Sequence, residues 1–165
     1  MIRKMQESDI PRVAEIHVFG WRSAYRGIVP DEHLFCKMQV ARSMERFTQM
    51  LTDPDTQKEN YVYDDGIVKG LLTIGPTEDE DKPNAFELWG IYIEPFFKGQ
   101  SIGTALTRYC EEVAIKLGYN EIILWTFEKN APARAFYEKL GYVTDGKTQM
   151  VGSYNAVGVR YTKQI

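Results

Sequence analysis

A short turn with small residues, placed before the most regular amphipathic helix of the sequence, could bind an anion. The turn reads Lys98-Gly99-Gln100-Ser101-Ile102-Gly103, and the small residues at 99, 101 and 103 would let a ligand approach the backbone. Unpaired N–H groups and the helix dipole at a helix N-terminus favour a phosphate or pyrophosphate. An ordinary tight connection between a strand and a helix has the same local pattern, so these residues alone leave both interpretations open.

Two common phosphate-binding motifs do not describe this turn. A P-loop needs Gly-Lys-Ser/Thr at a fixed distance after a first glycine, and the sequence has no such run. The dinucleotide fingerprint Gly-x-Gly-x-x-Gly does not fit glycines at 99 and 103. Metal chemistry has no support either, because the two histidines and two cysteines lack the spacing of zinc ligands.

The hydrophobic pattern predicts the elements that must position the turn. Apolar residues recur every three or four positions from Ile102 to Leu117, which indicates a helix that Gly118 would cap. Asp65-Gly66 between two apolar runs predicts a type I′ hairpin turn. The expected elements are strand 2–6, helices 8–25 and 31–51, strands 61–63, 68–74 and 86–94, helix 102–117, strand 122–127, helix 132–140, and strands 142–143 and 157–161. This order, βααβββαβαββ, predicts an α+β fold in a single domain over residues 1–165.

Composition excludes several functional classes. The chain has 165 residues, of which 44% are apolar and 26% charged, as in an ordinary globular domain. A net charge of −3 and the lack of any basic run argue against a nucleic-acid partner. No apolar stretch predicts a signal peptide or a membrane span. We therefore expect a cytoplasmic protein with reduced thiols and no membrane partner.

Three segments together resemble the GCN5-related N-acetyltransferases. The turn at 98–103 is similar to the acetyl-CoA signature Gln/Arg-x-x-Gly-x-Gly/Ala, with Lys98 replacing Gln/Arg and Ser101 replacing the first glycine. A second family segment is matched by Asn130, Ala133, Phe136, Tyr137, Lys139, Gly141 and Tyr142. The stretch Trp21–Pro30 also looks like many bacterial members, and the element order agrees along the whole chain. The resemblance implies a mixed, mostly antiparallel central sheet flanked by helices, and acetyl-CoA as the cofactor.

The resemblance also implies how the cofactor is held. The strand before the central helix would splay from its neighbour at a bulge, and the pantetheine arm would pair with the backbone of Ile91 and Ile93. A backbone N–H near Ile91 or Tyr92 would polarise the thioester carbonyl. The pyrophosphate would bind the amides of Lys98, Gly99, Gln100, Ser101, Ile102, Gly103 and Thr104. Ser101 would cost about 1 kcal/mol if it needed a positive φ, and little in a helix-start conformation, where its hydroxyl could bind phosphate.

Two residues are candidates for proton transfer. Tyr137 matches the family position whose hydroxyl faces the sulfur of coenzyme A, and it could give a proton to the leaving thiolate; the alternative is a core tyrosine. Glu87 lies eleven residues before Lys98, where some members carry a carboxylate base. Burial would raise its pKa. Alternatively, Glu87 is an exposed strand residue without a catalytic role, and a water molecule serves as the base.

The remaining candidates face the cofactor or the acceptor. Asn130 could bind the cofactor or cap the helix that follows it. Trp21, Tyr25 and Arg26 could line the acceptor pocket, although the two aromatic residues could equally pack in the core. The acidic run Glu78–Asp81 reads as a solvated loop, and its position beside the acceptor suggests a cationic acceptor.

The leading interpretation is an N-acetyltransferase that moves an acetyl group from acetyl-CoA directly to a primary amine of a small molecule or peptide. The alternative is a non-catalytic acyl-CoA-binding sensor or regulatory module. The sequence does not identify the acceptor, because one fold serves many acceptors. Aromatic residues on the last strands also raise the possibility of a homodimer.

Overall fold

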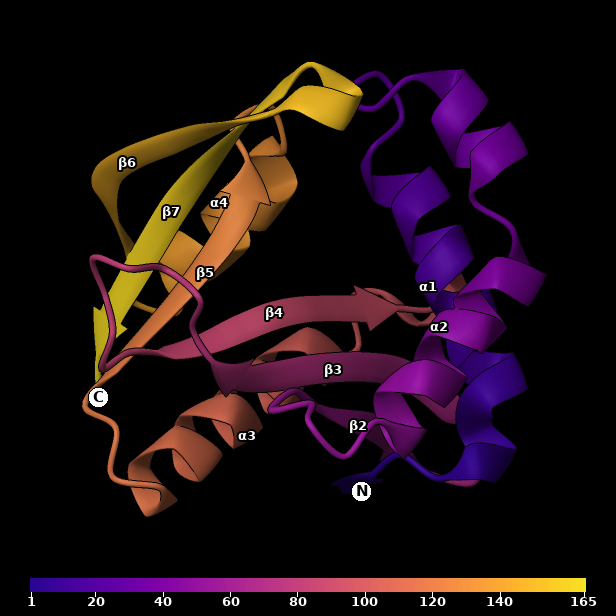
Figure 1. The fold of residues 1–165 in the computed structure, drawn as a ribbon, viewed down its shortest axis with the longest axis horizontal. Coiled ribbons are helices and arrows are strands. Elements are labelled where there is room, and N and C mark those ends of the chain that lie inside the picture. Colours follow the sequence, from indigo (N-terminus) through magenta and orange to yellow (C-terminus); the bar gives the residue numbers. More distant parts are fainter.

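The computed structural model describes residues 1–165, and it confirms the α+β class. One seven-stranded sheet has the order β1-β2-β3-β4-β5-β7-β6, and every neighbouring pair is antiparallel except β4 with β5 (Figure 1). The elements are β1 (Ile2–Lys4), α1 (Ile10–Ala24), α2 (Val40–Thr52), β2 (Glu59–Asp64), β3 (Val68–Pro76), β4 (Phe86–Ile93), α3 (Ile102–Lys116), β5 (Glu121–Phe127), α4 (Ala131–Lys139), β6 (Val143–Val151) and β7 (Ala156–Gln164). No helix is both long and apolar enough to cross a membrane.

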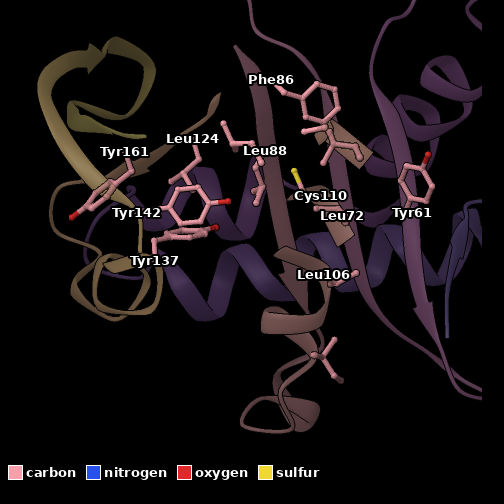
Figure 2. Packing of buried hydrophobic residues seen from close by; sticks show 14 of the residues in the cluster. Tyr61, Leu72, Phe86, Leu88, Leu106, Cys110, Leu124, Tyr137, Tyr142 and Tyr161 are labelled. Carbon is pink, nitrogen blue, oxygen red and sulfur yellow. The ribbon is translucent and has the colours of Figure 1, made fainter. Parts of the chain in front are cut away.

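The sheet separates two apolar cores. Side chains alternate along a strand, so the neighbours Leu71 and Leu72 of β3 point to opposite faces. Leu72 belongs to the larger core, which α3 and α4 cover and which Figure 2 shows. Leu71 belongs to the smaller core under α1 and α2. The two helix pairs therefore approach the central strands from opposite sides.

The central strands β4 and β5 pair only at their beginnings. Their parallel pairing covers Phe86 to Leu88, after which the two strands diverge (Figure 1). Thr73 of β3 pairs with Gly90 whereas the next residue, Ile74, pairs with Leu88, so Trp89 is an extra residue in β4. This is a β-bulge, which bends a strand and re-aims its side chains. The expected splay at a bulge is thus present.

Two local predictions about backbone conformation are wrong. Asp65 does not have a positive φ, so the turn is not type I′; Gly66 alone has φ +106°, and Asp64 pairs with Val68 across a three-residue connection. The helix expected over 31–51 is also interrupted. A single π-helical turn covers His33–Lys37, and Met38 is extended with ψ 104° before α2 begins.

The acidic run is an exposed loop, as expected, but it is also tied to the sheet. Glu78, Glu80 and Asp81 are exposed, whereas Asp79 and Asp81 form ion pairs with Arg160 of β7. Tyr161 is fully buried, and the large apolar residues exposed on β6 are Val143 and Met150. The aromatic surface that suggested a homodimer is therefore not present on these strands.

Candidate active site

The turn before α3 presents a row of free backbone donors. Gly99 and Ser101 have left-handed backbones, with φ 81° and 60°. The first hydrogen bond of α3 runs from the Ala105 N–H to the Ser101 carbonyl at 3.0 Å. The N–H groups from Gly99 to Thr104 have no hydrogen-bond partner in the protein. We call these N–H groups the amide cradle; together with the helix dipole they favour an anion.

The structure adds a local detail at three residues of the predicted anion-binding turn. The Lys98 N–H donates to the Pro95 carbonyl at 3.4 Å, so this amide is not free, and its Nζ donates to Ser23 Oγ of α1 at 2.9 Å. Ser101 takes the strained of its two possible conformations, which costs about 1 kcal/mol, and its hydroxyl does not cap the helix. A Cβ on Gly103 would lie 3.2 Å from side-chain atoms of Ile93 and Phe136, so glycine here also permits close packing of α3.

The diverging part of β4 has one free edge. From Gly90 to Ile93 the strand pairs with β3 on one side, while β5 pairs no further than Leu88 on the other. Ile91 and Ile93 pack toward the larger core, and Tyr92 points to the opposite face, where its ring centroid lies 4.9 Å from that of His17. An extended ligand could hydrogen-bond along this edge as an added strand does.

Tyr137 is a protonated phenol in an apolar setting. It is 9% exposed, and its ring makes an edge-on contact with Phe136 at a centroid distance of 5.1 Å. A second edge-on contact, with Tyr142, has a centroid distance of 5.9 Å, and Figure 2 shows these two tyrosines side by side. Its hydroxyl has no hydrogen-bond partner in the protein. Burial raises the pKa of Tyr137 well above its ordinary value, so the hydroxyl keeps its proton and is available as a donor.

Glu87 lies beside the point where β4 and β5 separate. It pairs with Ile123 and is 4% exposed, which rules out the exposed-strand alternative. Burial raises its pKa to about 7, although Thr77 Oγ1 donates to Glu87 Oε2 at 2.9 Å and partly opposes the shift. A carboxylate with a pKa near neutrality can both accept and release a proton under physiological conditions.

The buried guanidinium of Arg160 fixes the loop beside Glu87. Arg160 is 3% exposed and contacts three carboxylates, at 2.8 Å to Asp79, 2.9 Å to Asp81 and 2.6 Å to Asp145. Trp125 Nε1 donates to Asp79 at 3.1 Å. These contacts use Asp79 and Asp81 inside the protein, which weakens the case for a cationic acceptor, although Glu78 and Glu80 of the same run are exposed.

An aromatic cluster joins α1 to the far end of the sheet. Trp21 contacts Tyr25 and Tyr154 at centroid distances of 4.8 and 5.7 Å, and Tyr25 contacts Phe127 of β5 at 5.0 Å. Tyr154 lies in the turn Gly152–Tyr154 between β6 and β7, which reaches toward the α1–α2 connection (Figure 1). The Trp21 indole N–H is buried without a hydrogen-bond partner. Burial also raises the pKa of the Tyr25 hydroxyl.

Two adjoining cavities lie between these aromatic residues and α2. The larger has a volume of about 160 Å³ and is lined by His17, Trp21, His33, Lys37, Met38, Gln39, Arg42, Ser43, Arg46 and Tyr154. The smaller, about 70 Å³, is lined by His17, Arg46, Phe47, Met50, Lys58, Thr73, Trp89, Gly90 and Tyr92. Trp21 therefore lines a cavity, as expected, whereas Tyr25 supports its wall. Arg26 is exposed and lines neither cavity.

His17 and Asn130 make the contacts of structural residues. His17 Nδ1 lies 2.9 Å from Ser43 Oγ, and burial lowers the His17 pKa to about 3, so the ring is neutral. Asn130 Oδ1 accepts a hydrogen bond from the Ala133 N–H at 3.4 Å, which is the helix-cap alternative. The amide nitrogen of Asn130 is not used by this cap, so binding of the cofactor stays a prediction.

The sequence interpretation missed several lining residues, above all Arg42 and Arg46. The only local signal is two arginines four positions apart on a helix, which places them on one face. Tyr154 carried no signal, because only the folded chain brings residue 154 next to residues 21 and 33.

Comparison with known proteins gives a consistent result. A model of the acetyltransferase (GNAT) family matches residues 30–142. The N-acetyltransferase YuaI of Bacillus subtilis is 26% identical over 138 residues, which are 83% of this chain and 76% of that protein. A spermidine N(1)-acetyltransferase of Thermoplasma acidophilum is 25% identical over 148 residues, which are 88% of this chain and 91% of that protein.

Solved structures agree with the fold over the whole chain. The paia N-acetyltransferase of Thermoplasma acidophilum in complex with coenzyme A covers 100% of this chain and 98% of its own, with a TM-score of 0.77 and 20% identity. The structure of yncA from Salmonella typhimurium, with its cofactor acetyl-CoA, covers 99% of this chain and 92% of its own, with a TM-score of 0.70 and 16% identity. Because the family model covers more than half of the sequence, the chain belongs to the acetyltransferase (GNAT) family and is an N-acetyltransferase.

Proposed function

We propose that this N-acetyltransferase moves an acetyl group from acetyl-CoA directly to a primary amine, with Glu87 as the base and Tyr137 as the acid. The observation that supports this most is the burial of both side chains at β4 and α4. Burial raises both pKa values: that of Glu87 reaches about 7, so its carboxylate can accept a proton near neutral pH, and that of Tyr137 rises further above its ordinary value, so the phenol keeps its proton. A group that titrates near neutrality and a group that stays protonated suit the roles of base and acid.

The residues of the chain fit acetyl-CoA as the donor. The amide cradle offers main-chain donors to a pyrophosphate. The free edge of β4 offers Ile91 and Ile93 to an extended amide-containing arm. Two GNAT structures that share this fold contain coenzyme A and acetyl-CoA. Acetyl-CoA supplies a thioester carbonyl and a thiolate leaving group.

Each proposed residue then has one task. Glu87 accepts the proton that the attacking amine loses as the new C–N bond forms, directly or through a water. A backbone N–H of Ile91 or Tyr92 donates a hydrogen bond to the carbonyl oxygen as negative charge develops there. Tyr137 donates its proton to the sulfur as the C–S bond breaks. The Asn130 amide nitrogen is a further candidate contact for the cofactor.

The test compares binding with turnover. Titration calorimetry with acetyl-CoA, with NADH and ATP as controls, should give saturable one-to-one binding for acetyl-CoA alone. A panel of primary amines should then release free thiol from acetyl-CoA at a rate proportional to enzyme concentration. Binding without turnover across the panel would contradict the proposal and favour the acyl-CoA-binding sensor. Two finer expectations, a cytoplasmic location and a homodimer, stay predictions.

A further inference from the structure

The two cavities beside α2 carry positive charge and no carboxylate. Their lining includes four cationic side chains, and neither lining contains Asp or Glu. The cations are Lys37, Arg42, Arg46 and Lys58. A protein with a net charge of −3 thus has a local region of opposite sign where the acceptor is expected to bind.

Two of these cations already have partners. Lys37 Nζ lies 3.3 Å from a carboxylate oxygen of Glu32. Lys58 Nζ lies 2.9 Å from a carboxylate oxygen of Glu78 and 3.3 Å from the ring centroid of Trp89, a cation–π contact. Neither lysine therefore needs a ligand to balance its charge.

The two arginines, which lie on the exposed side of α2 at the mouth of the larger cavity, have no such partner in the protein. Arg42 donates only one long hydrogen bond, 3.4 Å to the Lys37 carbonyl, and Arg46 makes no hydrogen bond or ion pair. Glu45, the one acidic residue of α2, pairs with neither. Arg42 and Arg46 lie one turn apart on the same helix face, where like charges repel. A bound anion would relieve that repulsion and accept hydrogen bonds from both guanidinium groups.

The position of Arg46 connects this charge to the reaction. Arg46 and His17 line both cavities, so the two cavities adjoin at these side chains. The smaller cavity extends to Trp89, Gly90 and Tyr92, which form the bulge and the diverging part of β4. Arg46 lines the smaller cavity together with His17 and Tyr92. In agreement with this position, its positive charge adds to the lowering of the His17 pKa by burial and opposes the rise that burial causes in the Tyr92 pKa.

We propose that the acceptor is a small amine that also carries a carboxylate, and that Arg42 and Arg46 bind this carboxylate while the amine lies at the free edge of β4. This inference rests on the proposed function and names its substrate class. The neutral His17 adds no charge, so the two guanidinium groups determine the preference. A polyamine would bring a second cation toward the arginines and would be disfavoured.

The test uses amines that differ only in the charge at their far end. Butylamine, 4-aminobutanoate and 1,4-diaminobutane each have four carbons. Homologues with three to six carbons cover a range of distances between the reacting amine and the charged group. A phosphonate analogue, 3-aminopropylphosphonate, distinguishes a carboxylate from another anion. Turnover is measured as thiol release at saturating acetyl-CoA. We expect kcat/KM for the best aminocarboxylate to exceed that of butylamine by about ten- to a hundredfold, and the diamine to be poorest.

Charge variants make the assignment specific. R42Q and R46Q should each remove most of the preference for the carboxylate, measured as the ratio of kcat/KM for the aminocarboxylate to kcat/KM for butylamine. The double variant R42E/R46E should prefer the diamine. K116Q, at the exposed end of α3, is the matched control and should leave the preference unchanged. Far-ultraviolet circular dichroism and thermal melting check that each variant is folded.

The outcomes separate this inference from the proposed function. Turnover of butylamine and diamine as fast as aminocarboxylate, or a preference that survives R42E/R46E, overturns the carboxylate-binding role alone. A stronger preference for the phosphonate than for every aminocarboxylate overturns the assigned ligand class. Acetyl-CoA binding with no turnover of any amine overturns the proposed function and this inference with it.

Discussion

The regions that we propose for the cofactor and the acceptor, called here the cofactor end and the acceptor end, are built from different kinds of atoms. At the cofactor end, the amide cradle from Gly99 to Thr104 presents main-chain N–H groups. At the acceptor end, the cavities are lined by side chains from α1, α2 and the β6–β7 turn. Main-chain donors are kept by any residue that allows the conformation, whereas a side-chain contact disappears with one substitution. The cofactor end should therefore tolerate changes of side chain that the acceptor end does not.

The two ends also differ in how they are held in place. The cradle belongs to one continuous segment, closed by the first turn of α3. The acceptor end depends on contacts between distant parts of the chain, such as the contact of Trp21 with Tyr154 and the pairing of Asp79 with Arg160, 81 residues later. The acceptor end is thus the part whose shape depends on the complete fold.

Removal of the Tyr137 hydroxyl should have the largest effect and should separate chemistry from binding at the cofactor end. We expect Y137F to lower kcat by about 10²–10⁴-fold, the usual contribution of a positioned proton donor. The KM for acetyl-CoA should change little, because the cradle that we propose to bind it presents main-chain atoms. Steady-state kinetics of thiol release give both values.

The neighbouring Tyr142 provides the matched control for this prediction. Its hydroxyl donates to Glu111 at 3.1 Å within the same core, so Y142F should cost about 1 kcal/mol of stability and leave kcat nearly unchanged. An equal loss of kcat in Y137F and Y142F would contradict the assignment of Tyr137 as the acid.

The next largest effect is expected at Glu87, which lies between the two ends. In the parent enzyme, kcat/KM should rise with pH as Glu87 loses its proton, with an apparent pKa of about 7. E87Q should remove this rise of kcat/KM with pH. It should also lower kcat/KM at pH 8 by about 100-fold, the lower end of the range for a general base. Water can serve as a weaker base, so complete loss is not expected. T77V removes a hydrogen bond that lowers the Glu87 pKa, and should shift the rise of kcat/KM to higher pH.

The stability of E87Q provides the control for this prediction, because the raised pKa of Glu87 makes the stability of the parent depend on pH. Burial favours the protonated form in the folded state, so the folded protein binds more protons than the unfolded chain between about pH 4.5 and 7. Stability falls as the pH rises through that window. E87Q, which stays neutral, should therefore be more stable than the parent at pH 8 by on the order of 1–3 kcal/mol. A variant that is both less active and less stable would indicate a damaged fold instead.

Local sequence patterns predicted most helices and strands. They failed where a residue distant in the sequence determines the backbone conformation. The helix from Ile102 and its Gly118 cap follow from residue spacing and from a glycine with φ +86°. The break after Lys37 does not, because Arg22 of α1 donates to the carbonyls of Leu34 and Met38, at 2.9 and 3.1 Å. These hydrogen bonds satisfy carbonyl groups outside a regular helix, and no pattern within residues 31–51 contains them.

The candidate site likewise contains features that follow from the local sequence and features that depend on distant contacts. The cradle was predictable because small residues before a helix are a local feature, and Tyr137 was identified within a motif of adjacent residues. The burial of Glu87 was not settled by its neighbours, since it depends on how β5, Thr77 and the loop held by Arg160 cover it. Arg42 and Arg46 were not predicted, because only the folded structure shows that they line the cavities beside α2.

The smallest expected effect tests the cradle itself. Ser101 has φ 60°, a conformation that costs a residue with a Cβ about 1 kcal/mol more than glycine. Glycine also gains entropy in the unfolded chain, so S101G should raise the free energy of unfolding by only several tenths of a kcal/mol. Its Kd for acetyl-CoA should stay within about twofold of the parent value, because the N–H groups remain. Urea unfolding and titration calorimetry measure the two quantities.

Gly99 gives the converse control, because it has φ 81° and no atom within 4 Å of an added Cβ. G99A should therefore lose about 1 kcal/mol of stability through backbone strain alone. If S101G instead weakens acetyl-CoA binding by tenfold or more, the Ser101 hydroxyl contributes to the anion site, and the cofactor end also depends on a side chain. The cofactor end and the acceptor end would then differ only in how many side chains each uses to bind its ligand.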